Sequence, residues 1–161
     1  MSGEKLKVRQ ARESDVAAVL PMVSAQYALH VGWDEAKFGT KPGFETGFAR
    51  WMAGLASDER GVFLVAVDED DWPVGFLVAT TERELPLYLL KEYGFIHDVW
   101  VEEGHRGRGG ARGLVEGCLA RFKAIGVSQV RCETAQVNED ARVMFRKLGF
   151  RPTTVVMLKE I

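Results

Sequence analysis

The chain has 161 residues, of which 47% are hydrophobic and 27% charged, a composition that suits one globular domain with a sizeable core. Its 21 basic and 23 acidic residues leave a net charge of -2, which argues against a nucleic-acid partner because such proteins usually present a basic surface. The first residues lack an apolar signal core, no apolar run approaches the length of a membrane span, and the two cysteines are not in C-x-x-C spacing. We therefore expect a cytoplasmic protein with reduced thiols and no membrane partner.

The first half of the chain predicts a strand, two helices and a hairpin. Residues 6–10 alternate apolar and polar side chains, and a helix capped by Ser14 or Asp15 follows. Pro21 removes a backbone donor inside that helix, so we expect a kink or two shorter helices. Further elements are a loop over 30–43, an amphipathic helix over 44–55, and hairpin strands over 62–67 and 74–79. Residues 68–71 are all acidic but have neither histidine nor ligand spacing, so we expect a solvated turn and no metal site.

The second half of the chain alternates strands and helices. The apolar residues over 85–93 recur with no clear helix or strand period, and residues 95–101 predict the central strand. The next elements are a helix over 111–125, a strand over 127–134, a helix from Asn138 to Gly149, and a last strand over 150–159. An opening hairpin followed by this alternation predicts an α/β (α+β) fold, a mixed central sheet with helices on both faces. We expect a single domain over residues 1–161.

A glycine-rich loop, Arg106-Gly107-Arg108-Gly109-Gly110-Ala111, joins the central strand to the following helix. The first N–H groups of a helix have no intrahelical partner and attract anions, and glycines let a ligand approach the backbone closely. The two arginines add charged donors, so the loop suits a pyrophosphate. A Rossmann loop would instead follow the first strand, and an arginine–glycine RNA-binding tract would be long and disordered.

The residues on either side of this loop resemble a motif of a known protein family. The pattern R-x-x-G-x-A over 106–111, preceded by V-x-V at 99–101 and followed by Leu114-Val115, resembles the pyrophosphate-binding motif of the GNAT acetyltransferase superfamily. Residues 138–150 resemble a second signature of that family, N-x-x-A-x-x-x-Y-x-K-x-G-F, with a phenylalanine in place of the tyrosine. The resemblance extends more loosely from about Lys7 to the C-terminus.

The resemblance implies transfer of an acetyl group from acetyl-CoA to a primary amine of a small molecule or an exposed peptide, by direct attack in a ternary complex. The backbone N–H that the family directs at the thioester oxygen corresponds to Val101 or a neighbour between Trp100 and Glu103. Asn138 corresponds to a pantetheine contact. The residues that the resemblance places against acetyl-CoA are Val99, Trp100, Val101, Arg106, Gly107, Arg108, Gly109, Gly110, Ala111, Asn138 and Phe145.

The acceptor must lose a proton before it attacks, because an alkylamine with a pKa near 10.4 is neutral in only about one part in 2,500 at pH 7. The candidate bases are His97 and Asp98 on the central strand and Glu133 on the neighbouring one. Each has a purely structural alternative as a packed, paired or solvent-facing residue. Strand alternation predicts that His97 and Asp98 point to opposite faces of the sheet.

Phe145 stands where family members often have a tyrosine that protonates the departing thiolate. Phenylalanine cannot donate a proton, but a thiol with a pKa of about 8.5 leaves tolerably as the anion. We therefore expect slower transfer rather than none, unless Tyr93, Tyr88 or a water molecule supplies the proton. The same substitution favours an alternative function, a non-catalytic acyl-CoA-binding module.

The acceptor itself is not identified by any motif. By resemblance, its pocket is built from residues 21–51 and 80–93, and the aromatic side chains of the helix over 44–55 either join the core or line that pocket. Glu82, Glu84 and Glu92 suggest a cationic amine or are ordinary surface charge. The apolar last strand either forms a homodimer or packs within one chain.

Overall fold

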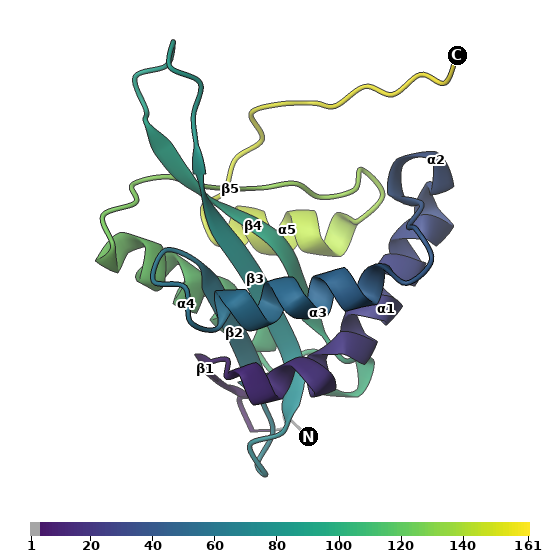
Figure 1. The fold of residues 1–161 in the computed structure, drawn as a ribbon, viewed down its shortest axis with the longest axis vertical. Helices are drawn as coiled ribbons and strands as arrows, with labels where there is room; N and C mark the ends of the chain where they lie inside the picture. Colours follow the sequence, from purple (N-terminus) through teal and green to yellow (C-terminus); the bar gives the residue numbers. More distant parts are fainter. Residues whose placement is uncertain (1–3) are drawn as a thin grey trace.

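Five strands form one sheet in the same order as in the chain (Figure 1). A computed structural model describes residues 4–161. The strands β1 to β4 pair in antiparallel fashion, and β5 pairs with β4 in parallel. Their bounds are β1 (Lys7–Gln10), β2 (Val62–Val67), β3 (Pro73–Arg83), β4 (Glu92–Val101) and β5 (Val130–Cys132). This arrangement confirms the predicted mixed sheet.

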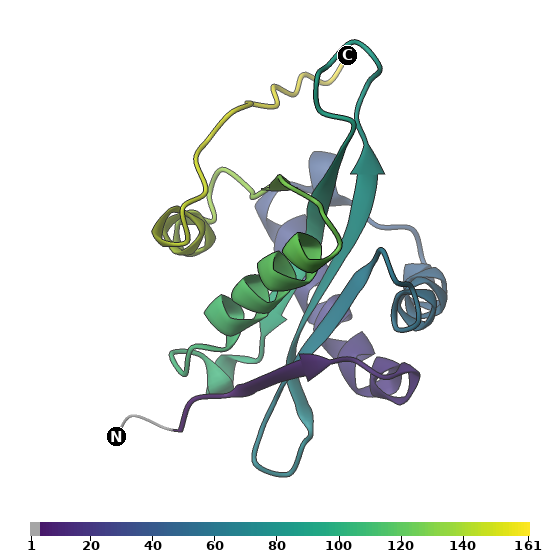
Figure 2. The same ribbon diagram turned by 90° about the vertical axis from the view of Figure 1, so that its left-hand side faces the viewer.

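Helices cover both faces of the sheet (Figure 2). On one face lie α1 (Val16–Trp33) and α3 (Phe44–Leu55), and on the other lie α4 (Gly110–Ala124) and α5 (Glu139–Lys147). The remaining elements are a short helix, α2 (Glu35–Phe38), and two 3-10 turns, η1 (Glu13–Asp15) and η2 (Glu103–His105). The predicted flanking of the sheet on both sides is therefore confirmed.

The two central strands are buried on both faces, which divides the core into two clusters. All of β2 and the first seven residues of β3 are buried. Gly113 and Gly117 of α4 allow that helix to lie close to the sheet, because an added Cβ would come within 3.1 Å of Val8 and Leu64 respectively. Helix α4 therefore packs closely on the sheet at these two positions.

Helix α1 runs through Pro21 as one continuous helix, so the alternative of two shorter helices is wrong. Proline removes only one hydrogen bond here, and the inner side of the helix compensates by burying Val19, Met22, Val23 and Gln26. Together with η1, the segment Glu13–Trp33 is long enough to cross a bilayer, and it contains an 18-residue stretch with a mean hydropathy of 1.2, contrary to the sequence-based expectation. Core helices of soluble domains meet the same criterion, and this helix packs on the sheet.

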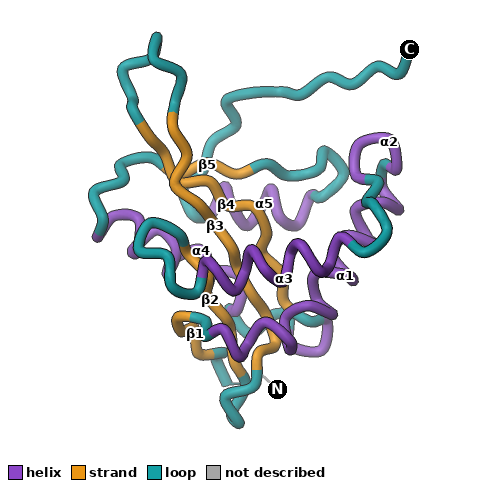
Figure 3. Tube along the Cα trace, viewed as in Figure 1, coloured by secondary structure: helices purple, strands orange, loops and turns teal. Residues whose placement is uncertain are grey.

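Three predicted elements differ from the structure. The expected loop over 30–43 contains the last turn of α1 and all of α2, and the strand expected over 127–134 is only three residues long. The last strand, expected over 150–159, is absent, because residues 151–161 lie exposed and away from the sheet as extended chain (Figure 3). A strand needs a partner, and within residues 4–161 no strand pairs with that segment.

Replacement of Gly94 by alanine tests how tightly α4 lies on the sheet. A Cβ at Gly94 in β4 would lie 2.6 Å from the ring of Phe122, which is fully buried and cannot move away. We expect Gly94→Ala to lower the free energy of unfolding by about 1–3 kcal/mol in urea denaturation. The control, Gly104→Ala, has no atom within 4 Å and should leave the stability nearly unchanged.

Candidate active site

The glycine-rich loop forms an open depression at the start of α4. Gly109 is the N-terminal cap of the helix, and both Gly107 and Gly109 have positive φ angles, 76° and 75°. The depression has a volume of about 230 Å³. Its lining residues are Val101, Arg106, Gly107, Gly109, Gly110, Ala111 and Arg112. The helix-start N–H groups and the adjacent arginines fit a pyrophosphate, as the sequence indicated.

The two arginines of the loop have different surroundings. Arg106 stacks its guanidinium over the Trp100 ring, 4.8 Å from the centroid, and its Nε donates to the carbonyl oxygen of Val101 at 2.9 Å. Arg106 is thereby held beside the depression by the end of β4. Arg108 instead donates from Nε to the carbonyl oxygen of Glu4 at 2.9 Å and does not line the depression. Its contact with the segment before β1 gives it a structural role in this chain.

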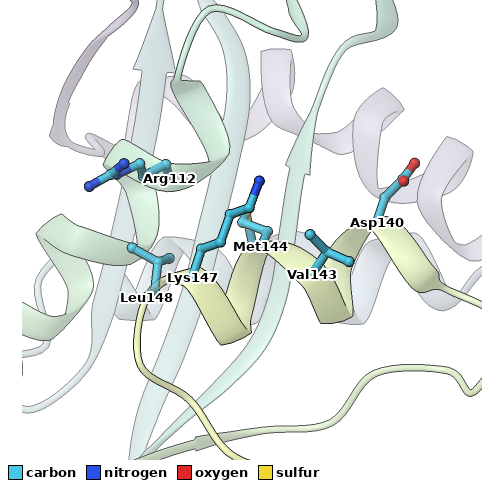
Figure 4. Close-up of a pocket in the computed structure, with 6 residues that line it drawn as sticks. All are labelled: Arg112, Asp140, Val143, Met144, Lys147 and Leu148. Atoms are coloured by element: carbon cyan, nitrogen blue, oxygen red, sulfur yellow. The ribbon is translucent and has the colours of Figure 1, made fainter.

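A second depression, of about 250 Å³, lies between the start of α4 and the outer side of α5 (Figure 4). Its lining residues are Arg112, Asp140, Val143, Met144, Lys147 and Leu148. Arg112 lines both depressions, so the two are adjacent. The sequence analysis did not single out Arg112 or Lys147, although the helical spacing of residues 140, 143, 144 and 147 would have placed that set on one face of α5.

The end of β4 has an open edge. Strand β5 pairs with β4 only over Gly94–Ile96, so the rest of that edge has no strand beside it. The Glu102 N–H donates to the carbonyl oxygen of Val74 on β3. Residue pairs along an antiparallel ladder alternate between hydrogen-bonded and non-hydrogen-bonded pairs. The N–H and C=O groups of Val99 and Val101 therefore point away from β3 and toward the open edge. These are the two backbone positions at which a ligand running beside β4 meets free donors.

A β-bulge at His97 changes which side chains share a face. Val78 of β3 pairs with Asp98 and Ala79 pairs with Ile96, so His97 is an extra residue in β4. Its ring contacts Trp51 of α3 at 5.2 Å, while Asp98 accepts a hydrogen bond from Tyr27 of α1. Both side chains thus lie on the α1–α3 face. The prediction that they point to opposite faces is wrong, because the bulge interrupts the two-residue period.

His97 belongs to a short polar network. The Thr80 hydroxyl donates to Glu82 at 2.6 Å, and the same Thr80 oxygen lies 2.6 Å from Nε2 of His97. Because Thr80 has a single hydroxyl proton, Nε2 must carry the proton that bridges these atoms, which leaves Nδ1 as the acceptor nitrogen. Burial lowers the pKa of His97, although nearby Glu82 opposes this shift. A neutral imidazole with a free acceptor nitrogen is able to take up a proton at neutral pH.

Asp98 is a buried carboxylate with one hydrogen-bond donor. Its residue is only 4% exposed, and the Tyr27 hydroxyl donates to its Oδ2 at 3.4 Å. Burial raises the pKa of Asp98 to about 6, although the hydrogen bond from Tyr27 lowers it in part. Asp98 is therefore ionised at neutral pH and takes up a proton only a little below it, the property expected of a general base.

The other predicted catalytic positions lie apart from this face. Glu133 is exposed just after β5. Phe145 of α5 is buried, and its ring packs edge-on against Phe150 at 5.0 Å. The hydroxyl-bearing alternatives lie near the β3–β4 hairpin, where Tyr88 is exposed and the Tyr93 ring lies 3.8 Å below the guanidinium of Arg131.

Asn138 caps α5, as the sequence predicted. Its Oδ1 accepts a hydrogen bond from the Ala141 N–H at 3.2 Å. This contact leaves the side-chain amide NH₂ as the group that would reach a ligand. Among residues 4–161, no cluster of three or more His, Cys, Asp or Glu side chains is arranged to hold a metal ion.

The family model described as the acetyltransferase (GNAT) family matches residues 25–150, which include the loop, the open edge of β4 and the bulge. The chain belongs to the GNAT family of acetyltransferases. Membership in the GNAT family implies acetyl-CoA as the co-substrate and an amine as the acceptor. The predicted family is thus confirmed.

Individual GNAT relatives agree with this assignment. The chain is 27% identical over 108 residues to YycN of Bacillus subtilis, described as an uncharacterized N-acetyltransferase. That match covers 67% of this chain and 66% of YycN, just under two thirds of its length.

One solved structure of similar fold is a mutant of the BH1408 protein from Bacillus halodurans, which is 22% identical to this chain and superposes with a TM-score of 0.83. The match covers 96% of this chain and 99% of the BH1408 chain. Another is the aminoglycoside 6'-N-acetyltransferase AAC(6')-Ih from Acinetobacter baumannii, with 19% identity and a TM-score of 0.72, covering 97% and 98%. At these identities the structures support the shared fold alone.

The buried state of Asp98 predicts a specific dependence of stability on pH. Folding raises the pKa of this carboxyl from 3.8 to about 6, so the folded state favours the protonated form. The stability that this preference contributes is fully present below pH 4 and is lost as the pH rises through 6. Asp98→Asn removes this ionisation, so we expect it to raise the free energy of unfolding at pH 8 by about 1–3 kcal/mol. Urea denaturation at pH 4 and pH 8 measures the difference.

The matched control for this measurement is Asp70→Asn, in the exposed β2–β3 turn. That variant should show the same pH dependence as the unmodified protein. If the free energy of unfolding of Asp98→Asn changed between pH 4 and pH 8 as much as that of the unmodified protein, the burial-driven pKa shift of Asp98 would be contradicted.

Proposed function

We propose that this chain is an acetyl-CoA-dependent N-acetyltransferase that acts on a primary amine of a small molecule or an exposed peptide by direct attack in a ternary complex. One observation carries the proposal. The open edge of β4 connects the glycine-rich loop, which suits a pyrophosphate, to the bulge at which His97 and Asp98 share a face. The domain extends over residues 1–161, requires no metal, and acts in the cytoplasm.

The chain's own residues hold the acetyl donor along one path. The helix-start N–H groups at Gly110 and Ala111, with Arg106, bind the pyrophosphate. The N–H groups of Val99 and Val101 and the C=O of Val99 bind the pantetheine arm as an added strand would, and the amide of Asn138 approaches it from α5. Trp100 orients Arg106 through the stacking contact. Arg112 and Lys147 extend the same path as cationic side chains.

Acetyl-CoA supplies a thioester carbonyl, and the chain supplies a donor and a base around it. A backbone N–H at the open edge, that of Val101 or of its neighbour Val99, donates to the carbonyl oxygen as negative charge develops there. The acceptor nitrogen forms a bond to the carbonyl carbon, and the carbon–sulfur bond breaks. The proton of the amine passes to the protein, and coenzyme A leaves as the thiolate.

Asp98 and His97 are the bases that the geometry favours. Asp98 is ionised at neutral pH in a buried position, and His97 presents an unprotonated Nδ1 on the same face. Glu133 is the third candidate, but it lies exposed beyond β5 and outside this cluster. We therefore propose that Asp98 takes the proton and that His97 assists in passing it to solvent.

Phe145 lies at the position of the usual acid and is part of the core. The thiolate therefore leaves without a proton from this position, and solvent protonates it, or Tyr93 or Tyr88 does so. The second candidate function is a non-catalytic acyl-CoA-binding module. The binding module is favoured because the Phe145 side chain has no proton to donate to the thiolate. This alternative predicts that the protein binds acetyl-CoA without turnover.

The exposed C-terminal segment suggests a homodimer. Val155, Val156, Met157 and Leu158 are all more than half exposed, although such residues are normally buried. The outer edge of β5 is also unpaired, since β5 ends the sheet. We propose that the segment over 153–159 pairs with the β5 edge of a second copy, which covers both surfaces at once.

Binding and turnover of acetyl-CoA test the proposed activity. Titration calorimetry should show binding of acetyl-CoA, and thiol release should follow the addition of a primary amine. Arg106→Gln removes charge from the depression and the contact with Val101, so we expect about 10- to 100-fold weaker acetyl-CoA binding. The matched control is Arg50→Gln, on α3 at the opposite face, which should bind acetyl-CoA normally.

Two further results would separate enzyme from binding module. In Asp98→Asn, kcat should fall by about 10²- to 10⁴-fold while acetyl-CoA affinity is kept. In the unmodified protein, kcat/KM should rise with pH across the pKa of about 6 at Asp98. Acetyl-CoA binding without thiol release for any amine would support the module, and no binding at all would refute the phosphate site.

Sedimentation measures the proposed homodimer directly. The unmodified protein should sediment as a dimer at micromolar concentrations, and Val156→Glu should shift it to the monomer because a charge cannot be buried at the pairing edge. Trp72→Glu is a matched control, because Trp72 is equally exposed but lies in the β2–β3 turn. A monomeric unmodified protein would contradict the pairing of the segment with a second copy.

A further inference from the structure

Aromatic rings form one continuous series of contacts from α2, across α1 and α3, to the bulge of β4. Neighbouring ring centroids in the series are 5.0–5.8 Å apart. In order, the rings are Phe38 and Trp33, which both contact His30, then Tyr27, which contacts Phe44 and Phe48, and then Trp51, His97 and Phe95. We call this set the aromatic wall.

The aromatic wall is a surface and not only core. Each of its side chains is partly exposed, whereas Val19, Val23 and Met52 beneath it are fully buried. Contiguous exposed aromatic surface on a soluble domain usually marks a binding site. The wall reaches His97, beside the open edge of β4, and therefore leads to the proposed point of acetyl transfer.

Three carboxylates lie along the wall. Asp98 is bonded to Tyr27, Glu82 lies 3.9 Å from Nε2 of His97, and Glu45 accepts a hydrogen bond from the Ser24 hydroxyl at 3.4 Å. Within residues 4–161, no lysine or arginine forms an ion pair with any of these three. The wall is thus negatively charged, and its ring faces add further attraction for a cation.

We propose that the aromatic wall binds the acceptor and that the acceptor is an arylalkylamine, a primary ammonium joined by a short chain to an aromatic ring. The inference rests on the proposed transferase function and specifies its substrate class. Aromatic rings favour edge-to-face contact with another ring, and carboxylates favour an ammonium. A polyhydroxylated amino sugar would instead need many hydrogen-bonding partners, and the four phenylalanines of the wall offer none.

The two parts of such an acceptor match the two parts of the wall. The ring of the amine packs on Trp51 and Phe48, and its ammonium lies toward Asp98 and His97. One proton passes from the ammonium to the carboxylate or to Nδ1 of the imidazole. The neutral nitrogen that remains is then held at the open edge of β4, where its bond to the acetyl carbon forms and the carbon–sulfur bond breaks. Coenzyme A leaves as the thiolate, and the nitrogen gives up its second proton to solvent as the amide forms.

Initial rates of thiol release at saturating acetyl-CoA test the inference with four amines. The panel is 2-phenylethylamine, its non-aromatic match 2-cyclohexylethylamine, spermidine and glucosamine. We expect kcat/KM for 2-phenylethylamine to exceed that for 2-cyclohexylethylamine by about tenfold and those for the two polar amines by more. Titration calorimetry of each amine, in the presence of coenzyme A, measures binding independently of turnover.

Variants of Trp51 test the wall itself. Trp51→Leu should raise KM for 2-phenylethylamine about tenfold and leave the Kd for acetyl-CoA unchanged, and Trp51→Phe should restore most of the loss. Trp72→Leu is the control for loss of an exposed tryptophan in the β2–β3 turn and should behave as the unmodified protein. An unchanged KM in a folded Trp51→Leu would overturn the inference.

The outcomes also distinguish failure of the inference from failure of the proposed function. Preferred acetylation of spermidine, glucosamine or 2-cyclohexylethylamine would overturn the inference and leave the transferase function standing. Binding of 2-phenylethylamine with no thiol release from any amine would overturn the transferase function while supporting the wall as its binding site. If 2-phenylethylamine is neither bound nor acetylated, the inference is overturned.

Discussion

The incomplete pairing of β4 is the constraint on which the site depends. One edge of this strand is bonded to β3 along its length, while β5 covers the other edge only over Gly94–Ile96. Backbone N–H and C=O groups that leave a sheet without a partner must find one in water or in a ligand. The open edge is therefore a linear array of donors and acceptors in the middle of the protein, and an extended ligand matches it as an added strand would.

The bulge at His97 gives this edge its chemistry. Without the extra residue, His97 and Asp98 would lie on opposite faces, one against α4 and the other against α1. With it, an imidazole and a buried carboxylate lie on one face, next to Tyr27 and Trp51. The sheet then separates two tasks, since the phosphate loop and α5 lie on one side while the aromatic wall lies on the other.

Burial determines how each polar group on the α1–α3 face behaves. The same desolvation that raises the pKa of Asp98 lowers that of His97, because in each case the charged form loses hydration. The two groups are thereby brought closer in proton affinity than they are in water. In the proposed mechanism, a proton from the acceptor amine passes to solvent through this pair.

Much of the fold followed from periodicity and turn chemistry in the sequence. The amphipathic stripes of α3 and α4, the cap at Asn138 and the hairpin over 62–79 depend on residues close together in the chain, so their patterns are visible locally. The glycine-rich loop was recognisable for the same reason. Its chemistry arises from backbone N–H groups and a few neighbouring side chains.

Other features required the tertiary structure, because they depend on partners that are distant in sequence. The bulge depends on the register between β3 and β4, and the residues around His97 give no sequence signal that predicts it. The aromatic wall unites rings from α1, α2, α3 and β4 that the sequence separates by up to 70 residues or so. The last strand shows the same limit, since residues 150–159 have strand composition but pair with no strand among residues 4–161. By itself, then, the sequence determined the family, the order of most elements and the phosphate loop, whereas only the tertiary structure decided which side chains meet at the open edge, because strand register and packing are long-range interactions.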